Sequence, residues 1–327
     1  MLDRKVIGIG NAIFDIVCEV SEEFLVKHSL VKGSMSLIDE SIANKLSKLQ
    51  PVKISSGGSA GNTIATISQL GNPSSFIGKV AEDEFGKQFI AEIEKSGTYY
   101  SSKSYADSAS AKSFILVTED GQRTMCTFLG CASQITTNDI DEGVIKGHDI
   151  LYLEGYLWDQ DSTIEALKKA IQIAKNNKIK IAFTLSDFFC VARHKNDFLK
   201  LIANDLDILF ANEQEIQELL DIKDITRDDF GHLNDFFAKN KNLIAVITRE
   251  KNGYIVFDHG KFSAQTAHKV NNVVDSTGAG DAFAAGFLYE FSNGKSAFEA
   301  AKKGNLCASK IIQKFGARFD DSELKNL

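Results

Sequence analysis

The sequence is poor in proline and cysteine. Its two prolines, Pro51 and Pro73, are too few to mark domain boundaries, which must be inferred from glycine and polarity instead. The five cysteines are scattered, and no two form a Cys-x-x-Cys pair. An odd, dispersed set is typical of reduced thiols and argues against a disulfide framework or a structural zinc site. We therefore expect a cytoplasmic protein.

Long runs of one character are also absent. There is no stretch of about eighteen apolar residues, and the N-terminus leads into a strand-like segment at 6–9 without a leader-like apolar run, so no membrane segment is expected. No basic run of five occurs and the formal net charge is -7, which argues against nucleic acid as a partner. With 43% hydrophobic and 25% charged residues, the 327-residue chain is long enough for one large α/β domain with an appendage.

The most informative stretch lies near the C-terminus. Residues 270–274 are rich in valine and predict a strand, residues 275–281 read Asp-Ser-Thr-Gly-Ala-Gly-Asp, and residues 282–291 predict a helix that opens at Gly280 or Asp281. Gly278 and Gly280 permit a tight turn whose N–H groups converge where the positive end of the helix dipole also acts. The stretch predicts a site for an anion such as phosphate.

Asp281 distinguishes this turn from an ordinary phosphate loop. A carboxylate beside an anion site can accept a proton from a hydroxyl while the amides hold a transferring phosphoryl group, which indicates a small-molecule kinase. The alternative is that Asp281 only caps the helix and the glycines only form a turn. The length of the motif favours the kinase, as does Gly286, because a mid-helix glycine costs about 1 kcal/mol and usually marks close packing.

This segment resembles the signature of the ribokinase-like, or PfkB, family of sugar and nucleoside kinases. The resemblance implies an α/β fold in which a central, mostly parallel sheet is flanked by helices and a small β-sheet forms a lid. It implies that Asp281 is the catalytic base and that the amides of Gly278, Ala279 and Gly280 form the anion hole for the γ-phosphate of ATP. Thr277, in the same motif, would contact the nucleotide.

A second glycine-rich segment lies at residues 55–63, which read Ser-Ser-Gly-Gly-Ser-Ala-Gly-Asn-Thr and run into a helical pattern at 64–71. The segment lacks the Gly-Lys-[Ser/Thr] of a P-loop, which excludes a Walker NTPase here. It resembles the other signature of the PfkB family. The resemblance implies that Gly57 and Gly58 let the backbone approach the acceptor and that Asn62 bonds the acceptor hydroxyls.

The first turn, residues 8–15, starts like a dinucleotide-binding fingerprint. Ile13 stands where the third glycine should be, and no acidic residue follows about twenty positions later, so a dehydrogenase is disfavoured. By resemblance to the kinase family, Asn11 lies beneath the acceptor and Asp15 bonds two of its hydroxyls. A carboxylate suits a vicinal diol because its two oxygens can accept from both hydroxyls. The alternative for Asp15 is an exposed strand-end aspartate.

Strand-like segments without a helix pattern occur within residues 16–40, and residues 111–118 and 124–128 flank a turn at 119–122. They predict a small sheet. By resemblance, segments 16–40 and 106–129 form a lid over the acceptor, and segments 1–15, 41–105 and 130–327 form the large α/β domain. Arg123 matches a lid arginine near the transferred phosphate, although taken alone it could be a solvated surface charge.

From about residue 145 the pattern alternates between strands at 150–153, 179–184 and 208–211 and helices at 163–176 and 197–203. Such alternation predicts βαβ units and a parallel sheet covered on both faces, with functional residues at the carboxyl ends of the strands. Asn212 and Glu215 fall at such an end. The resemblance implies that they organise Mg²⁺ through water. Alone, the tetrapeptide at 212–215 also suits a helix start.

Two further positions point to the nucleotide. Residues 244–248 predict a buried strand followed by a hairpin turn at 252–253. Thr248 ends this strand and is a nucleotide-binding candidate, although residues 248–250 read Thr-Arg-Glu where family members often have Thr-x-Gly. Asn305 matches a family helix position that lines the adenine site; a plain helix-face asparagine is the alternative.

The sequence thus predicts an ATP- and Mg²⁺-dependent kinase that phosphorylates a primary hydroxyl. Residues 55–62, 119–125 and 153–158 look most like adenosine-kinase-type members of the family, and Phe14, Tyr156 or Trp158 could stack on a purine. The rivals are a ribokinase- or fructokinase-type enzyme acting on a free sugar and a non-catalytic ligand-binding protein of the same fold. We expect a monomer or a lid-mediated homodimer.

Overall fold

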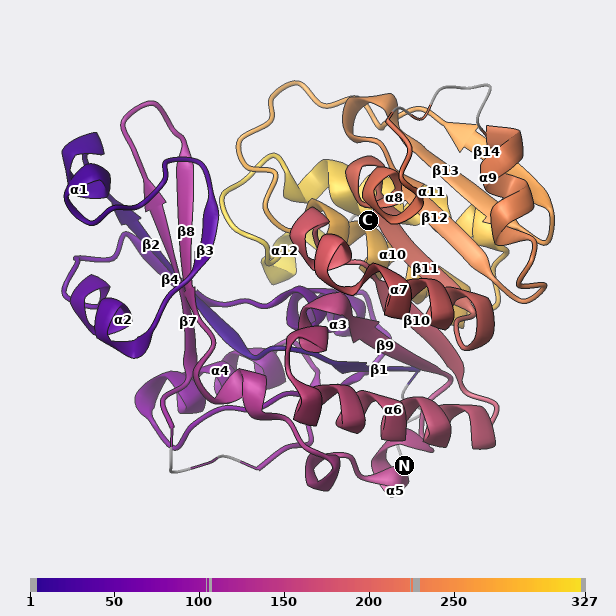
Figure 1. Ribbon diagram of the computed structural model, residues 1–327, viewed down its shortest axis with the longest axis horizontal. Helices are drawn as coiled ribbons and strands as arrows, with labels where there is room; N and C mark the ends of the chain where they lie inside the picture. Colours follow the sequence, from indigo (N-terminus) through magenta and orange to yellow (C-terminus); the bar gives the residue numbers. More distant parts are fainter. Residues whose placement is uncertain (1–4, 104, 106–107, 224, 226–229, 325–327) are drawn as a thin grey trace.

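The computed structural model describes residues 5–103, 105, 108–223, 225 and 230–324, and in this part of the chain the strands form two sheets (Figure 1). The large sheet has nine strands in the order β14 (Lys261–Gln265), β13 (Tyr254–Asp258), β12 (Ile244–Thr248), β11 (Ile208–Asn212), β10 (Lys180–Thr184), β9 (Ile150–Glu154), β1 (Val6–Ile9), β5 (Ser75–Ile77) and β6 (Tyr99–Tyr100). All pairs are parallel except those of β13, which is antiparallel to both neighbours. The predicted parallel sheet and the hairpin after residue 248 are confirmed.

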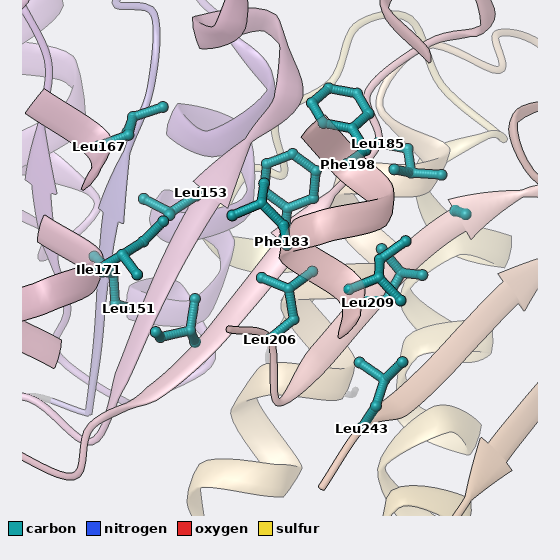
Figure 2. Close-up of a cluster of buried hydrophobic side chains, with 14 of the residues drawn as sticks. Leu151, Leu153, Leu167, Ile171, Phe183, Leu185, Phe198, Leu206, Leu209 and Leu243 are labelled. Atoms are coloured by element: carbon teal, nitrogen blue, oxygen red, sulfur yellow. The ribbon is translucent and has the colours of Figure 1, made fainter. Parts of the chain in front are cut away.

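Helices cover both faces of the large sheet, because its strands are apolar on both sides. One hydrophobic layer lies under α5 (Glu142–Ile145), α6 (Asp161–Asn176), α7 (Phe188–Asn204), α8 (Glu213–Leu220) and α9 (Phe230–Phe237). Figure 2 shows Leu153 and Phe183 of the sheet beside Phe198 of α7 in this layer. The other layer involves α3 (Ser59–Gln69), α4 (Glu84–Lys95), α10 (Ala279–Ser292) and α11 (Ala297–Ile311).

Helices α10 and α11 approach closely at Gly286. A Cβ at this position would lie 2.8 Å from Cys307 Sγ and 2.8 Å from the carbonyl oxygen of Lys303. Any side chain at residue 286 would therefore push the two helices apart. The close packing predicted from this mid-helix glycine is confirmed.

The small sheet has the order β3 (Met35–Leu37), β8 (Arg123–Phe128), β7 (Ala111–Val117), β2 (Ile13–Glu19) and β4 (Lys53–Ser56). The predicted hairpin around residues 119–122 is present as β7 and β8. Two short helices, α1 (Glu22–Lys27) and α2 (Glu40–Leu46), pack on the outer face of this sheet. In Figure 1 they lie at the far left, away from the large sheet.

Helix α1 corrects the expectation that residues 16–40 contain no helix. Ser21 caps it by accepting from the amide of Phe24, and Glu22 and Glu23 occupy the first turn, where their charge suits the helix dipole. Six residues are too few for a 3.6-residue hydrophobic period to stand out, which is why the pattern was missed.

Residues 41–56, which the predicted division assigns to the large domain, pair and pack with the small sheet instead. Strand β4 is antiparallel to β2, and Ala43 and Leu46 of α2 pack against Phe114 of β7. The edge of β2 and the apolar outer face of the sheet both need a partner, and this segment supplies one for each. The division into a large domain and a lid remains a prediction.

The strand predicted at residues 270–274 is wrong. This segment is a loop in which Val273 is 55% exposed, and it is attached to the C-terminal segment because the amides of Val274 and Asp275 donate to the carbonyl of Ile312. A β-branched run becomes a strand only where a sheet edge can pair with it, and none of the described strands pairs here.

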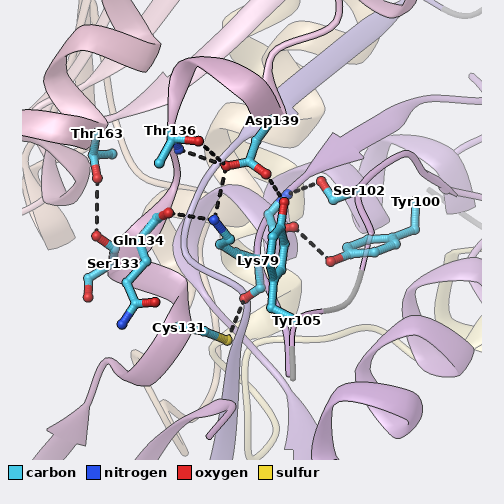
Figure 3. Close-up of polar contacts among 11 residues, drawn as sticks. Lys79, Tyr100, Ser102, Tyr105, Cys131, Ser133, Gln134, Thr136, Asp139 and Thr163 are labelled. Atoms are coloured by element: carbon cyan, nitrogen blue, oxygen red, sulfur yellow. Dashed lines mark hydrogen bonds and ion pairs between the residues drawn. The ribbon is translucent and has the colours of Figure 1, made fainter. Parts of the chain in front are cut away.

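A buried polar cluster fixes the segment that returns from the small sheet to the large one (Figure 3). It joins the loop after β5 to the 3₁₀ helices η1 (Gly130–Gln134) and η2 (Thr137–Asp139). Lys79 Nζ donates to the carbonyl of Gln134 at 2.6 Å and to Asp139 at 3.1 Å, and it lies 3.8 Å from the ring centre of Tyr105. The described part of the chain also contains the short elements η3 (Gly155–Asp159), η5 (Glu250–Asn252) and α12 (Asp321–Leu324).

Candidate active site

A cavity of about 600 Å³ lies between the carboxyl edge of the large sheet and the inner face of the small sheet. Most of the predicted site residues line it: Asn11, Asp15, Gly58, Asn62, Asn212, Glu215, Thr248, Thr277, Gly278, Ala279, Gly280 and Asp281. The remaining three, Arg123, Gly57 and Asn305, are not on its wall. Residues from both ends of the chain thus meet at the place where the topology of a parallel sheet directs ligands.

The glycine-rich turn forms the cavity wall at the start of α10. Gly278 caps this helix with φ +77°, a left-handed conformation, and a Cβ there would lie 2.5 Å from Cβ of Ala317. Apart from its own helix backbone and chain neighbours, no heavy atom of the described residues would lie within 4 Å of a Cβ at Gly280, so this residue borders open space. The amide of Ala279 donates to the carbonyl of Ser276 at 3.2 Å and closes the turn. Of the three amides predicted to hold an anion, this one already has an acceptor in the turn.

Asp281 lies in the first turn of α10 and faces helix α3. Its two carboxylate oxygens accept from Ser59 Oγ at 2.7 Å and from Asn62 Nδ2 at 3.0 Å. Burial raises the pKa of Asp281, and these two hydrogen bonds and the nearby charge of Arg318 oppose the rise. A carboxylate oriented in this way and enclosed by protein can accept a proton from a hydroxyl placed in the cavity.

Asp15 and Gly57 come together where β2 faces the cavity. A Cβ at Gly57 would lie 2.3 Å from Asp15 Oδ2, so only glycine leaves room for this carboxylate. Burial raises the pKa of Asp15 to about 7; Arg318 opposes the rise and Asp281 adds to it. The residue is therefore not the exposed strand-end aspartate of the alternative interpretation.

Arg123 connects the small sheet to the glycine-rich turn. Its Nη1 donates to Asp275 and, at 2.6 Å, to Thr277 Oγ1. Burial alone would raise the pKa of Asp275, but hydrogen bonds from Gly316, Thr277 and Arg123 lower it. The arginine predicted for the lid is thus hydrogen-bonded to two residues just before Gly278.

Asn212 and Glu215 form a capping box at the start of α8. The amide and the side-chain Nδ2 of Asn212 donate to the two oxygens of Glu215 at 2.9 and 2.7 Å. Burial raises the pKa of Glu215 to about 7, although the backbone hydrogen bond from Asn212 lowers it and Asp187 adds to the rise.

This donor set fits magnesium only through water. Both Glu215 oxygens already accept hydrogen bonds, and within the described residues no three His, Cys, Asp or Glu side chains gather into a metal-binding group. Magnesium keeps several of its waters in such sites, and those waters can donate to the second lone pairs of Glu215.

The two predicted nucleotide contacts differ in placement. Thr248 lies on the cavity wall, and its hydroxyl donates to the carbonyl of Ala211 at 3.4 Å. Asn305 lies off the wall, and its amide bonds the backbone of His268 and Thr266, each at 3.2 Å. In this structure its side chain fastens the loop before the glycine-rich turn to α11.

Two of the three aromatic rings suggested for base stacking lie in the core. Phe14 is fully buried and packs edge-to-face on Phe85, because successive side chains of a strand point to opposite faces and Asp15 takes the cavity side. Trp158 packs on Phe183 in the large hydrophobic layer. Of these three residues, Tyr156 lines the cavity.

Glu154 is a cavity residue that the sequence analysis did not select. It is completely buried at the end of β9, where it accepts from the amide and Nδ2 of Asn11 at 2.7 and 3.0 Å and from the amide of Ala60 at 2.8 Å. Burial raises its pKa to about 7 although these hydrogen bonds lower it. Its position at the carboxyl end of a predicted buried strand was a usable signal.

Comparisons with known proteins agree on one family. A family model described as pfkB family carbohydrate kinase matches residues 25–324. A probable sugar kinase from Rhizobium etli has a TM-score of 0.90 and 37% identity, with 100% of this chain and 98% of that chain covered. Adenosine kinase from Sinorhizobium meliloti has a TM-score of 0.89 and 36% identity, with 99% and 98% covered. The curated 5-dehydro-2-deoxygluconokinase of Halalkalibacterium halodurans is 26% identical over 267 residues, which are 79% of this chain and 80% of that protein.

In the described residues, no helix combines the length and the apolar character that crossing a bilayer requires.

Proposed function

The chain belongs to the pfkB family of carbohydrate kinases, which transfer a phosphoryl group from ATP to a hydroxyl, and we propose that its acceptor is the primary hydroxyl of adenosine. In the proposed reaction Asp281 takes the proton of the attacking hydroxyl while the N-terminal end of α10 stabilises the charge on the transferred phosphoryl group. The hydrogen bonds from Ser59 and Asn62 orient the carboxylate for this task. Positioning and electrostatics supply most of the rate in such transfers.

The observation that carries the nucleoside proposal is the apolar wall at the acceptor end of the cavity. Met35 and Met125 pair across β3 and β8 and line the cavity together with Leu37, Leu129 and Ile13. A nucleobase has an apolar face that this wall can cover, and methionine adapts its shape to an aromatic ring. A free sugar presents hydroxyls on all sides, and those that face this apolar wall would have no hydrogen-bond partner. The 36% identity to an adenosine kinase over nearly its full length supports the same acceptor.

Asp15 would bind the ribose diol, with Asn11, Asn62 and the backbone at Gly57 and Gly58 around it. These residues come from two separate segments, 11–15 and 57–62, and all but Gly57 lie on the cavity wall. The pairing of two hydroxyls with one carboxylate would favour the ionised form of Asp15 and offset the cost of its burial.

Asn212 and Glu215 would hold Mg²⁺ through water, and Thr248, Thr277 and Asn305 would contact the nucleotide. When bound, magnesium neutralises charge on the phosphates of ATP. Arg123 would leave Asp275 and Thr277 to reach the transferred phosphoryl group, whose oxygens offer it a stronger partner.

A free sugar is the second candidate acceptor, because a polar row crosses the inner face of the small sheet. Asp15, Ser113 and Thr127 are neighbours across β2, β7 and β8, and the Ser113 and Thr127 hydroxyls lie 3.0 Å apart. Such a row could bond several hydroxyls of one sugar. Relatives named as kinases of sugars or sugar acids are consistent with this alternative.

The test is ADP release from MgATP with adenosine, guanosine, ribose, fructose and fructose phosphate, with Asp281→Asn as the blank. Adenosine-dependent turnover that disappears in the variant is the expected result. Turnover on sugars alone would retain the mechanism and refute the acceptor. An active Asp281→Asn enzyme would refute the base, and the absence of ADP release with every acceptor would favour the ligand-binding protein.

A further inference from the structure

The C-terminal segment that follows α11 forms the back of the glycine-rich turn. The amide of Gly316 donates to Asp275 Oδ2 at 2.8 Å, and Ala317 lies against Gly278, where it leaves no room for a Cβ. Residues 41 and 39 positions apart along the chain are thereby packed against each other. The next residue, Arg318, lies near the carboxylates of Asp15 and Asp281.

Arg318 is connected to Asp281 through one side chain. Its Nε donates to Asn62 Oδ1 at 2.7 Å, and Asn62 Nδ2 donates to Asp281 Oδ2 at 3.0 Å. Because an amide has its acceptor and its donors at opposite ends, the guanidinium fixes which end of Asn62 faces Asp281. Removal of Arg318 would leave Asn62 Oδ1 without this donor, so that the amide would be held from the Asp281 side alone.

Three carboxylates act on Arg318: Asp15 of β2, Glu92 of α4 and Asp281 of α10. Asp275 and Lys53 of β4 also act on Asp15, and Asp281 acts on Glu154. Burial lowers the pKa of Arg318 to about 10, so the group is still charged at neutral pH. Among the described residues its Nη2 has no hydrogen-bond partner, and it lies 3.5 Å from where a Cβ of Gly61 would be.

Burying a charged guanidinium is costly unless opposite charges nearby compensate it. Its interaction with Asp15 and Asp281 favours the ionised form of both carboxylates, against the effect of burial. A base that must accept a proton and a carboxylate that must accept two hydroxyl hydrogen bonds both need to be ionised.

We propose that Arg318 is a positioning residue of the phosphoryl transfer, which directs the amide of Asn62 toward Asp281 and compensates the charge of Asp281 and Asp15. The proposal rests on the proposed function in that it takes Asp281 as the base. Arg318 does not line the cavity and acts through these neighbours.

The test compares Arg318→Met, Arg318→Lys and a control, Lys314→Met, which removes a cation that pairs with Asp320 and Glu323 in the same segment. The pH dependence of kcat/KM is measured from pH 5 to 9 with the acceptor found above. In Arg318→Met the acid limb should move upward by about one pH unit, so that activity falls by up to about tenfold at pH values on the limb and returns to the wild-type level above it. Arg318→Lys should restore part of the shift, and Lys314→Met should leave the limb in place.

A uniform loss at every pH with an unmoved limb would overturn the proposal, because a merely structural role predicts that result. If the wild-type protein phosphorylates no acceptor, the proposed function fails. The role of Arg318 is then tested by the pH dependence of the unfolding free energy alone. The destabilisation caused by Arg318→Met should then grow between pH 5 and 8, as the carboxylates ionise beside a missing cation. A destabilisation that is constant over this range would refute the charge role.

Discussion

Replacing Gly280 with alanine should separate the stability of the protein from its activity. A Cβ at this position meets no heavy atom within 4 Å, and residue 280 lies in the first turn of α10. Alanine is favoured over glycine in a helix by about 0.5–1 kcal/mol. We therefore expect the free energy of unfolding of Gly280→Ala to equal or slightly exceed that of the wild type.

The same methyl group would point into the open cavity where the predicted anion site lies. A displacement of the phosphoryl group by about 1 Å costs on the order of 10²-fold in rate, and loss of one stabilising donor costs about 10²–10³-fold. We expect kcat/KM to fall about hundredfold, which corresponds to roughly 2.7 kcal/mol of transition-state stabilisation.

Gly278→Ala is the matched variant that should behave differently. Its φ of +77° costs an L-residue about 1–2 kcal/mol, and its Cβ would overlap with Ala317. This variant should lose both stability and activity. Urea unfolding followed by circular dichroism and ADP release from MgATP measure the two quantities. A Gly280→Ala enzyme with wild-type kcat/KM, or one as unstable as Gly278→Ala, would refute the reasoning.

Three further predictions concern buried groups. Burial raises the pKa of Glu154 to about 7, so the contribution of this group to stability is complete below its ordinary pKa and is lost as the pH rises through 7. The unfolding free energy should therefore fall between pH 5 and 8, and Glu154→Gln should make this fall smaller. An unchanged slope of unfolding free energy against pH would contradict the prediction. Gly57→Ala would place a Cβ 2.3 Å from Asp15 Oδ2 and should raise the KM for the phosphoryl acceptor but not the KM for ATP. If initial-rate kinetics show the same change in both KM values, Asp15 does not bind the phosphoryl acceptor. Lys79→Met leaves Asp139 buried without its cation and should lower the free energy of unfolding in urea by about 3–5 kcal/mol. The double variant with Lys79→Met and Asp139→Asn should recover part of this loss. Equal stability of the single and the double variant would speak against the ion pair.

Local patterns were sufficient where the chemistry lies within a few residues. The turn with Gly278, Gly280 and Asp281 was predicted because glycine freedom and helix-end electrostatics act over one turn of chain. The strand and helix order after residue 145 followed from hydrophobic runs long enough to identify. The same reasoning could have assigned Phe14 to the core, since it alternates with Asp15 along β2.

Local patterns failed where an outcome depends on a distant partner. The valine-rich segment at 270–274 has the composition of a strand but no sheet edge to pair with, and its amides bond Ile312 instead. Asn305, which stays a predicted nucleotide contact, likewise has partners that no local pattern shows, because its amide bonds the backbone at residues 266 and 268.

By itself, the sequence determined the parallel α/β architecture and the composition of the glycine-rich turn, because these depend on side-chain period and on backbone freedom. Only the tertiary structure decided which groups surround Asp281. Ser59 and Asn62 are about 220 positions away along the chain, and Arg318 follows the last long helix in an irregular segment that carries no motif. Burial and the charges of Arg318 and Asp15 set the ionisation of the site, and these are properties of packed neighbours rather than of any stretch of sequence.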